Sequence, residues 1–177
     1  MKYSIIIPHY NRPDLILNCV NSFKDLKDKE IIIIDDVSTP ENLKKLQHNL
    51  ESIKKEQNIN LYLSQEKLFL PGARNKGIEM AQGEWIFFID DDDEATDGFI
   101  KWLNKNKVQD KIDFYRFPNI ECVNGKNKIY IFKWWHKKYS AQVSTYLFNK
   151  QFLIEKKLKF NEKVYYGEDF EFMVQLF

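Results

Sequence analysis

Short apolar runs alternate with segments whose apolar residues recur at helical spacing along the first half of the chain. Four strands are predicted, at Tyr3 to Pro8, Glu30 to Ile34, Ile59 to Leu63 and Glu84 to Ile89. Three helices are predicted after the first three of these strands, opening near Pro13, Pro40 and Pro71, and the third runs to Ala81 before Gly83. Because such regular alternation is typical of right-handed crossovers, the predicted fold class is α/β with a mainly parallel sheet.

The second half of the chain has a different pattern. Strands are predicted at Ile112 to Phe117, Ile120 to Val123 and Lys128 to Trp134, with Asn124-Gly125 as a hairpin turn. These segments indicate a small antiparallel extension of the core. A strand, a short helix and an apolar helix are expected at Thr145 to Phe148, Gln151 to Lys157 and Glu168 to Phe177. The last helix has no stop signal, so we expect the chain to be cut at its C-terminus.

Composition narrows the class of protein. The 177 residues are 44% apolar and 30% charged, as in one globular domain. Lys plus Arg number 27 and Asp plus Glu 26, so no global field attracts nucleic acid. Cys19 and Cys122 form neither a disulfide framework nor a metal cluster, and the longest apolar run, Trp85 to Ile89, is too short to cross a bilayer. A cytoplasmic, reducing location is therefore expected. Aromatic residues make up 15% of the chain, which suits either a core or a stacking surface.

Two acidic clusters follow predicted strands. Asp35-Asp36 comes after Glu30 to Ile34, and Asp90 to Asp93 comes after Glu84 to Ile89. Since ligands bind beyond the carboxyl ends of parallel strands, the fold brings both clusters to one rim. Alternate residues of an extended segment point the same way, so Asp90 and Asp92 are expected to face one hard cation such as Mg²⁺ or Mn²⁺. The alternatives are a solvated acidic turn and, for Asp35-Asp36, a helix cap.

A divalent cation on this rim points to a phosphate ligand. The chain has no Walker sequence and no dinucleotide-type glycine triplet, which disfavours an NTPase or a dehydrogenase. It has Pro71 to Gly77 at a predicted helix start, where backbone N–H groups and Arg74 are expected to meet a diphosphate. The alternative is an exposed helix with ordinary surface charge.

These segments together resemble the inverting glycosyltransferases of family 2, which have the GT-A fold. Five stretches in the family's order carry the resemblance: Ser4 to Arg12, Ile34 to Thr39, Gly72 to Gly77, Phe88 to Asp93 and Gly167 to Asp169. Val37 departs from the family's usual glycine, and Pro40 from its frequent aspartate. The resemblance implies one GT-A domain over residues 1–177, with residues 1–95 as a nucleotide-binding half and 96–177 as an incomplete acceptor-side half.

The resemblance also implies roles for individual residues. It assigns a nucleotide-binding group, which consists of Pro8, Tyr10, Asn11, Asp36, Arg74, Asp90 and Asp91. Within it Tyr10 packs on the base, Asp36 accepts a hydrogen bond from the base, and Pro8 shapes the strand end. Asp90 and Asp92 match the Asp-x-Asp element, for ribose and a divalent metal, with Asp91 or Asp93 as substitutes. For Tyr10 the alternative is plain core packing.

Asp169 matches the catalytic base of the family. The residues support this role independently, because Asp169 shares one helical stripe with Phe172 and Met173 and lies in a first turn, where the helix dipole favours an ionised carboxylate. Glu168 lies about 100° around the helix. Glu168 is expected to be the second catalytic residue, as an orienting or acceptor-contacting group. For Asp169 and Glu168 alike, the alternative is that the carboxylate only compensates the charge of the helix N-terminus.

The resulting hypothesis is a metal-dependent inverting transfer of sugar from a nucleotide-diphosphate sugar, expected to be a UDP sugar, to a glycan or lipid-linked acceptor in surface polysaccharide synthesis. The alternatives are a nucleotidyltransferase and a catalytically silent sugar-nucleotide binding module. Trp134 to Lys138 is expected to line an acceptor cleft or to touch a lipid headgroup region at the membrane periphery, unless it is a buried strand end with a basic turn.

Overall fold

A six-stranded sheet forms the centre of the computed structural model, which describes residues 1–51, 53–54, 56–106, 108, 112–117, 119–123, 126–130 and 142–176. The strand order is β3-β2-β1-β4-β8-β5, with β1 Tyr3–His9, β2 Lys29–Asp35, β3 Ile59–Leu63, β4 Trp85–Phe88, β5 Phe114–Arg116 and β8 Tyr146–Asn149. Strands β1 to β4 are parallel, and β8 runs antiparallel to β4 and β5. This confirms the predicted α/β class with a mainly parallel sheet.

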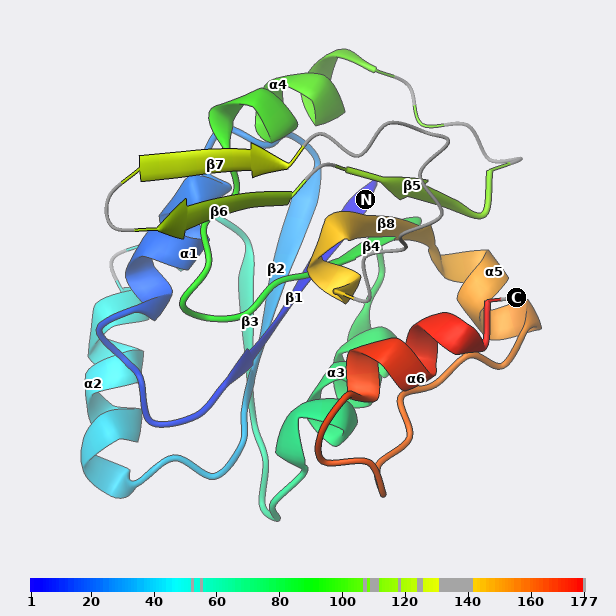
Figure 1. Ribbon diagram of the computed structural model, residues 1–177. Helices are drawn as coiled ribbons and strands as arrows, with labels where there is room; N and C mark the ends of the chain where they lie inside the picture. Colours follow the sequence, from blue (N-terminus) through cyan, green and yellow to red (C-terminus); the bar gives the residue numbers. More distant parts are fainter. Residues whose placement is uncertain are drawn as a thin grey trace.

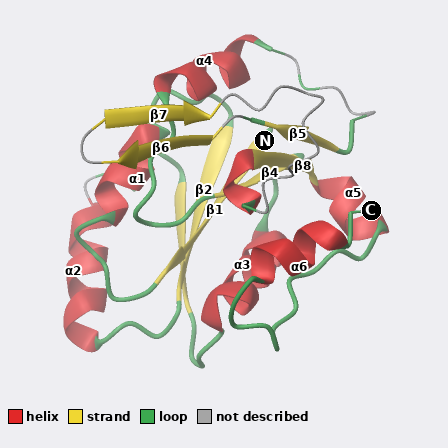
Figure 2. Ribbon diagram, viewed as in Figure 1, coloured by secondary structure: helices red, strands yellow, loops and turns green. Residues whose placement is uncertain are grey.

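Helices cover both faces of the sheet (Figures 1 and 2). One face packs against α1 Ile16–Ser22, α2 Pro40–Glu51 and α4 Asp97–Lys105. The other packs against α3 Phe69–Met80, α5 Lys150–Glu155 and α6 Glu168–Val174. In Figure 1, α1 and α2 lie on one side of the sheet, and α3 and α6 on the other.

The strand sequences explain this two-sided burial. Ile31 and Ile33 enter the core with α1 and α2, whereas Ile32 and Ile34 enter the core with α3 and α6, and all four are fully buried. Because neighbouring side chains of a strand alternate between faces, a continuous isoleucine run requires a cover on both. Each such side chain contributes about 1.5–3 kcal/mol on burial, so this core fixes the strand ends that carry the site.

Many of the aromatic residues belong to the core on the α3 and α6 side. The ring of Phe172, on α6, stacks on Phe160 with centroids 4.1 Å apart. Phe88 of β4 meets both rings edge to face, with centroid distances of 5.3 Å to Phe160 and 6.4 Å to Phe172. This packing attaches the short helix α6 to the central sheet.

Some element boundaries differ from the prediction. Helix α1 begins at Ile16, because residues 13–15 form a turn ahead of it. Helix α3 begins at Phe69, two residues before the expected start at Pro71, because the Asp36 carboxylate accepts hydrogen bonds from the backbone N–H groups of Leu68 and Phe69 and caps the helix there. The residues Pro71 to Gly77 therefore lie within the helix rather than at its free end.

The predicted antiparallel extension is present. Strands β6 Asn119–Val123 and β7 Lys126–Tyr130 pair antiparallel as a two-stranded sheet. The predicted hairpin turn Asn124-Gly125, the end of the strand predicted to reach Trp134, and the segment Trp134 to Lys138 lie outside the described residues. Among the helices that the structure describes, none is both long and apolar enough to cross a membrane.

Candidate active site

A pocket of about 440 Å³ opens at the carboxyl ends of β1, β2 and β4. Its lining comes from β1 and the turn after it, the ends of β2 and β4, and the start of α3: Pro8, His9, Tyr10, Arg12, Asp36, Lys67, Phe69, Leu70, Ala73 and Asp90. We call it the strand-end pocket. Four residues predicted to bind nucleotide, Pro8, Tyr10, Asp36 and Asp90, are brought together here, as the topology predicts.

Asp36 bonds to the segment before α3 and so holds together one wall of the strand-end pocket. Its side chain is 8% exposed and accepts hydrogen bonds from the Leu68 and Phe69 N–H groups, at 2.6 Å and 3.1 Å. The Lys67 ammonium lies 3.0 Å from Asp36 Oδ2 and donates to the Asp36 carbonyl oxygen at 2.9 Å. The carboxylate therefore joins β2 to the start of α3, and its charge is balanced within the protein.

Tyr10 lies beside this anchor. Its side chain is 48% exposed, and the Lys67 Nζ atom lies 3.0 Å from the centroid of its ring. Core packing, the alternative left open by the sequence, does not describe a side chain that lines a pocket. Asn11, also predicted to bind nucleotide, instead accepts hydrogen bonds from the Thr39 N–H and the Asn42 amide, and so joins the β1 end to the loop before α2. A nucleotide contact for Asn11 stays a prediction.

The acidic run after β4 forms a turn, in which the Asp93 N–H donates to the Asp90 carbonyl oxygen, rather than the extended segment on which the expectation of a shared cation rested. Asp91 is fully buried, its Oδ2 lies 2.7 Å from His9 Nδ1, and its Oδ1 contacts the Arg12 guanidinium. Asp90 and Asp92 have side chains that are 40% and 46% exposed. Asp92 accepts a hydrogen bond from Arg12 at 2.6 Å. Burial and the neighbouring carboxylates of Asp90 and Asp92 raise the pKa of Asp93.

These carboxylates fit a divalent cation that is shared with a substrate. The described residues contain no group of three or more His, Cys, Asp or Glu side chains that would hold a metal by themselves. Mg²⁺, however, is usually bound by one or two carboxylates together with substrate phosphates and water. Asp92 and Asp90 would supply hard oxygen ligands of that kind, and Arg12 would then have to leave Asp92.

Arg74 connects the acidic run to α6. Its side chain is 3% exposed, yet its guanidinium donates to three carboxylates: Glu168 at 3.3 Å, Asp169 at 2.5 Å and Asp90 at 3.1 Å. The Phe160 ring lies 5.2 Å from the guanidinium carbon. Arg74 is not one of the residues that line the strand-end pocket. Its contacts place it between Asp90 and Asp169, and its predicted contact with a diphosphate stays a prediction.

Asp169 points into the protein, as its place on the apolar stripe predicts. Oδ1 binds Arg74, and Oδ2 accepts a hydrogen bond from the Val143 N–H at 3.0 Å. Burial raises the pKa of Asp169, whereas Arg74 and the Val143 N–H act in the lowering direction, and the charges of Glu168 and Asp90 raise it further. A carboxylate held by two donors in a partly desolvated position has the properties of a general base.

Other residues, to which the sequence analysis gave no role, hold this arrangement together. Asn75, the residue after Arg74 on α3, donates to the Phe160 carbonyl and accepts from the Phe160 N–H, both at 2.9 Å. It thereby fixes the segment that leads to α6. His9, Arg12 and Asn75 all lie in stretches that carry the family resemblance, and that membership is the sequence signal that could have pointed to them.

Val37, the departure from glycine, has φ of +59° and is 42% exposed. A β-branched residue rarely adopts this left-handed conformation, which glycine adopts freely. The loop between β2 and α2 thus keeps a glycine-type backbone without the glycine.

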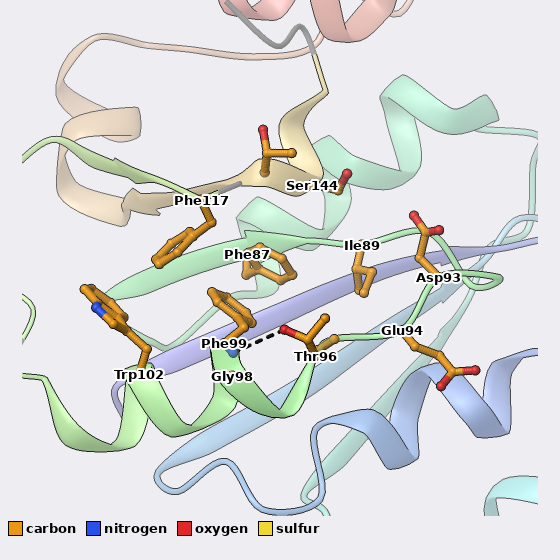
Figure 3. Close-up of a pocket in the computed structure, with 12 residues that line it drawn as sticks. Phe87, Ile89, Asp93, Glu94, Thr96, Gly98, Phe99, Trp102, Phe117 and Ser144 are labelled. Atoms are coloured by element: carbon orange, nitrogen blue, oxygen red, sulfur yellow. Dashed lines mark hydrogen bonds between the residues drawn. The ribbon is translucent and has the colours of Figure 1, made fainter. Parts of the chain in front are cut away.

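A second pocket, of about 370 Å³, lies on the α4 side of the sheet (Figure 3). Rings of Phe87, Phe99, Trp102 and Phe117 gather on one side of it, and Asp93 and Glu94 lie on the other. We call it the aromatic pocket. Phe99 lies 4.8 Å from Phe87 and 4.7 Å from Phe117, between ring centroids, and its N–H bonds to Thr96 at the start of α4. Of the residues named here, the sequence analysis gave a possible role only to Asp93, as a substitute in the Asp-x-Asp element.

Comparisons with known proteins agree with this architecture. The model of the family described as glycosyl transferase family 2 matches residues 4–168. A poly(ribitol-phosphate) beta-glucosyltransferase of Bacillus spizizenii is 39% identical over 113 residues, 60% of this chain and 17% of the relative. A GalNAc(5)-diNAcBac-PP-undecaprenol beta-1,3-glucosyltransferase of Campylobacter jejuni is 37% identical over 105 residues, 58% of this chain and 33% of the relative. The chain therefore spans a third or less of the length of these two relatives.

Solved structures share the fold. S. aureus TarS 1-349 in complex with UDP-GlcNAc superposes with a TM-score of 0.76 at 20% identity, covering 99% of this chain and 53% of that one. A mannosyltransferase of Pyrobaculum calidifontis in complex with GDP-Man and Mn²⁺ gives a TM-score of 0.66 at 15% identity, covering 95% of this chain and 50% of that one. At these identities the likeness shows the GT-A type of fold alone. Because the family model matches residues 4–168, nearly the whole chain, the chain belongs to glycosyl transferase family 2.

Proposed function

We propose that this chain binds a UDP sugar in the strand-end pocket and transfers the sugar, with inversion, to a glycan or lipid-linked acceptor during synthesis of a surface polysaccharide. One observation carries the proposal. Arg74 joins Asp90, at the end of β4, to Asp169, on α6, so that a donor-side carboxylate and a candidate base meet at a single buried guanidinium. The relatives named as glucosyltransferases and the UDP-GlcNAc complex of TarS support a UDP-sugar donor.

Asp169 acts as the general base. Its carboxylate takes the proton of an acceptor hydroxyl while the hydroxyl oxygen attacks the anomeric carbon from the face opposite the diphosphate. The bond to the diphosphate breaks as the new bond forms, configuration inverts, and UDP leaves. Glu168 accepts a hydrogen bond from the same Arg74 guanidinium, and we expect it to contact the acceptor. Burial raises the pKa of Asp169, and Arg74 acts in the opposite direction, toward the ionised form that a general base requires.

Negative charge develops on the leaving diphosphate. Asp92 and Asp90 would hold a divalent metal ion, Mn²⁺ or Mg²⁺, which supplies Lewis-acid stabilisation of that charge when it is bound. Arg12 bonds to Asp92 and contacts Asp91. Arg12 lines the strand-end pocket, and a guanidinium there would be able to donate to an oxygen of the diphosphate.

Metal dependence is tested by titrating UDP into the chain with and without Mn²⁺. We expect Mn²⁺ to strengthen UDP binding in the wild type and to have no effect in Asp92→Asn. Lys45→Met, which removes an exposed charge that pairs with Asp14 and not with the acidic run, is the control and should respond as the wild type does. Equal UDP affinity with and without the metal in the wild type would contradict metal dependence.

The reaction class is tested by its products. Incubation of the chain with UDP sugars and water should release UDP slowly, because a water molecule replaces the acceptor. Pyrophosphate release from a nucleoside triphosphate and a sugar phosphate would instead identify a nucleotidyltransferase. Binding of UDP sugars with neither product would identify a silent binding module.

A further inference from the structure

A buried histidine at the end of β1 meets the acidic run. The His9 Nδ1 atom lies 2.7 Å from Asp91 Oδ2, and both side chains are fully buried. The backbone carbonyl of His9 accepts a hydrogen bond from the Asp36 N–H at 2.9 Å, so the residue is also tied to the end of β2. The proposed function gives this imidazole no task, although His9 is one of the residues that line the strand-end pocket.

The partners of the imidazole indicate where its proton lies. An ionised carboxylate accepts hydrogen bonds and donates none, so Nδ1 of His9 must carry a proton to bond to Asp91. The other ring nitrogen, Nε2, is buried and has no hydrogen-bond partner among the described residues. A buried N–H without an acceptor is costly, and Asp91 already has the charge of Arg12 beside it. The geometry therefore favours a neutral imidazole with its proton on Nδ1.

The contact with His9 falls where the acidic run leaves the sheet. The Ile89 N–H still bonds to β1, at 3.1 Å. Two residues further on, in the turn, the side chain of Asp91 bonds to the His9 imidazole. The side chains of Asp90 and Asp92, on either side of Asp91, are 40% and 46% exposed. A bond that holds the middle carboxylate therefore fixes the turn that carries the outer two.

We propose that His9 is a positioning residue that fixes the acidic run through Asp91. The flanking carboxylates, Asp90 and Asp92, are thereby held at the edge of the strand-end pocket. This inference rests on the proposed function, in which those two carboxylates hold the metal ion. Asp91 also contacts Arg12, so the same bond fixes a guanidinium that lines the pocket. His9 acts through Asp91, which is fully buried and is not one of the lining residues.

Two measurements test the contact without any ligand. In proton–nitrogen spectra of the imidazoles, we expect a proton on Nδ1 of His9, whose signal is the one missing in His9→Asn. The second measurement is hydrogen exchange of the Asp93 N–H, which closes the turn on the Asp90 carbonyl. His9→Leu, which donates no hydrogen bond, should speed this exchange by about tenfold, because the turn opens more often.

His9→Asn separates a hydrogen-bond donor from a space-filling side chain. Its side-chain amide places an N–H group close to the position of Nδ1, whereas leucine is closer to histidine in volume and donates nothing. We therefore expect His9→Asn to exchange the Asp93 N–H like the wild type. If His9 only filled space, leucine would be the milder substitution and asparagine the more damaging one.

Titration with UDP and Mn²⁺, and separately with uridine, locates the effect in the site. His9→Leu should lose about tenfold in UDP affinity, as for a lost hydrogen bond to a charged group. Its affinity for uridine, which has no diphosphate, should stay within about twofold of the wild type. His9→Asn should restore most of the UDP affinity. His48→Leu is the control, because His48 is an exposed histidine on α2, and it should bind as the wild type does.

A double-mutant cycle tests whether the effect passes through Asp91. In the Asp91→Ala background, His9→Leu should change UDP affinity by less than about twofold, because the partner is already missing. A loss as large as in the wild-type background would contradict the proposed route.

Two other results would overturn the positioning role alone. One is an Nδ1 atom of His9 without a proton. The other is an equal loss of UDP and uridine affinity in His9→Leu, which would assign the residue to the fold as a whole. Failure of the wild type to bind UDP would instead overturn the proposed function. The imidazole spectra and the exchange of the Asp93 N–H would then decide by themselves whether His9 fixes the acidic run.

Discussion

The strand-end pocket and the aromatic pocket lie on either side of the acidic run, and they differ in how their polar groups are partnered. At the strand-end pocket, Asp36 and Asp90 each meet a cation of the protein, Lys67 and Arg74. The aromatic pocket has its rings packed against one another, with Asp93 and Glu94 at its margin. Pocket volume alone therefore does not identify a site. We expect the site at the strand ends, where carboxylates have fixed donors of the protein.

The first prediction concerns the base. Asp169→Asn should lower sugar transfer by about a thousandfold, because general-base catalysis contributes roughly 10²–10⁴-fold and asparagine cannot accept the proton. UDP affinity should stay within about twofold of the wild type, since Asp169 does not line the strand-end pocket. Transfer is measured as UDP release in the presence of acceptor.

Glu171→Gln is the matched control for this variant. Glu171 lies on the same helix and bonds to Gln175 rather than to Arg74, so its loss should leave turnover unchanged. Turnover of Asp169→Asn equal to that of the control would remove Asp169 as the base.

The second prediction concerns Arg74. Arg74→Met should lower the free energy of unfolding by about 3 kcal/mol, because removing one partner of a buried ion pair leaves the other carboxylates uncompensated. The variant should also move the acid limb of the activity profile to higher pH. Arg74 lowers the pKa of Asp169, whereas burial, Glu168 and Asp90 raise it, so without the guanidinium the base is protonated at higher pH.

Urea denaturation and a pH profile of kcat/KM measure the two effects of Arg74→Met. A profile whose acid limb does not move, together with lower stability, would mean that Arg74 only supports the fold.

Sequence reasoning reached the strand ends because two patterns agree there. The isoleucine runs fix β1 and β2 as strands covered on both faces, and acidic residues follow directly, so topology alone gathers Pro8, Asp36 and Asp90. The apolar stripe of α6 likewise predicts that Asp169 points inward. The stacking of Phe172 on Phe160 holds α6 in the orientation that turns Asp169 toward the protein.

Contacts between side chains that are far apart in the chain could not be predicted from the sequence. Arg74 and Asp169 are 95 positions apart, and nothing local distinguishes a guanidinium that meets a diphosphate from one that meets carboxylates. The start of α3 was also missed, because its cap is the side chain of Asp36 from another loop rather than a neighbouring residue. The aromatic pocket has no signal at all, since rings from β4, α4 and the β5 end read as ordinary core residues.

The third prediction separates the two pockets. Phe99→Ala should lower the free energy of unfolding by about 2 kcal/mol, because it removes a half-buried ring that contacts Phe87 and Phe117. UDP affinity should change by less than twofold. A loss of UDP affinity as large as that of a strand-end variant would place the nucleotide in the aromatic pocket instead.

The fourth and smallest effect concerns the loop after β2. Val37→Gly should raise the free energy of unfolding by about 1 kcal/mol, since it relieves a left-handed β-branched residue and incurs some chain entropy. Thermal or urea unfolding measures the change. Equal or lower stability would mean that the valine side chain makes compensating contacts in this loop.

A UDP titration of the isotopically labelled chain, followed by amide and indole chemical shifts, shows whether the nucleotide binds at the strand ends or at the aromatic pocket. We expect saturable shift changes at Tyr10, Asp36, Lys67 and Phe69, with the indole N–H of Trp102 unmoved. Changes centred on Trp102 and Phe99, with the strand-end residues silent, would contradict it.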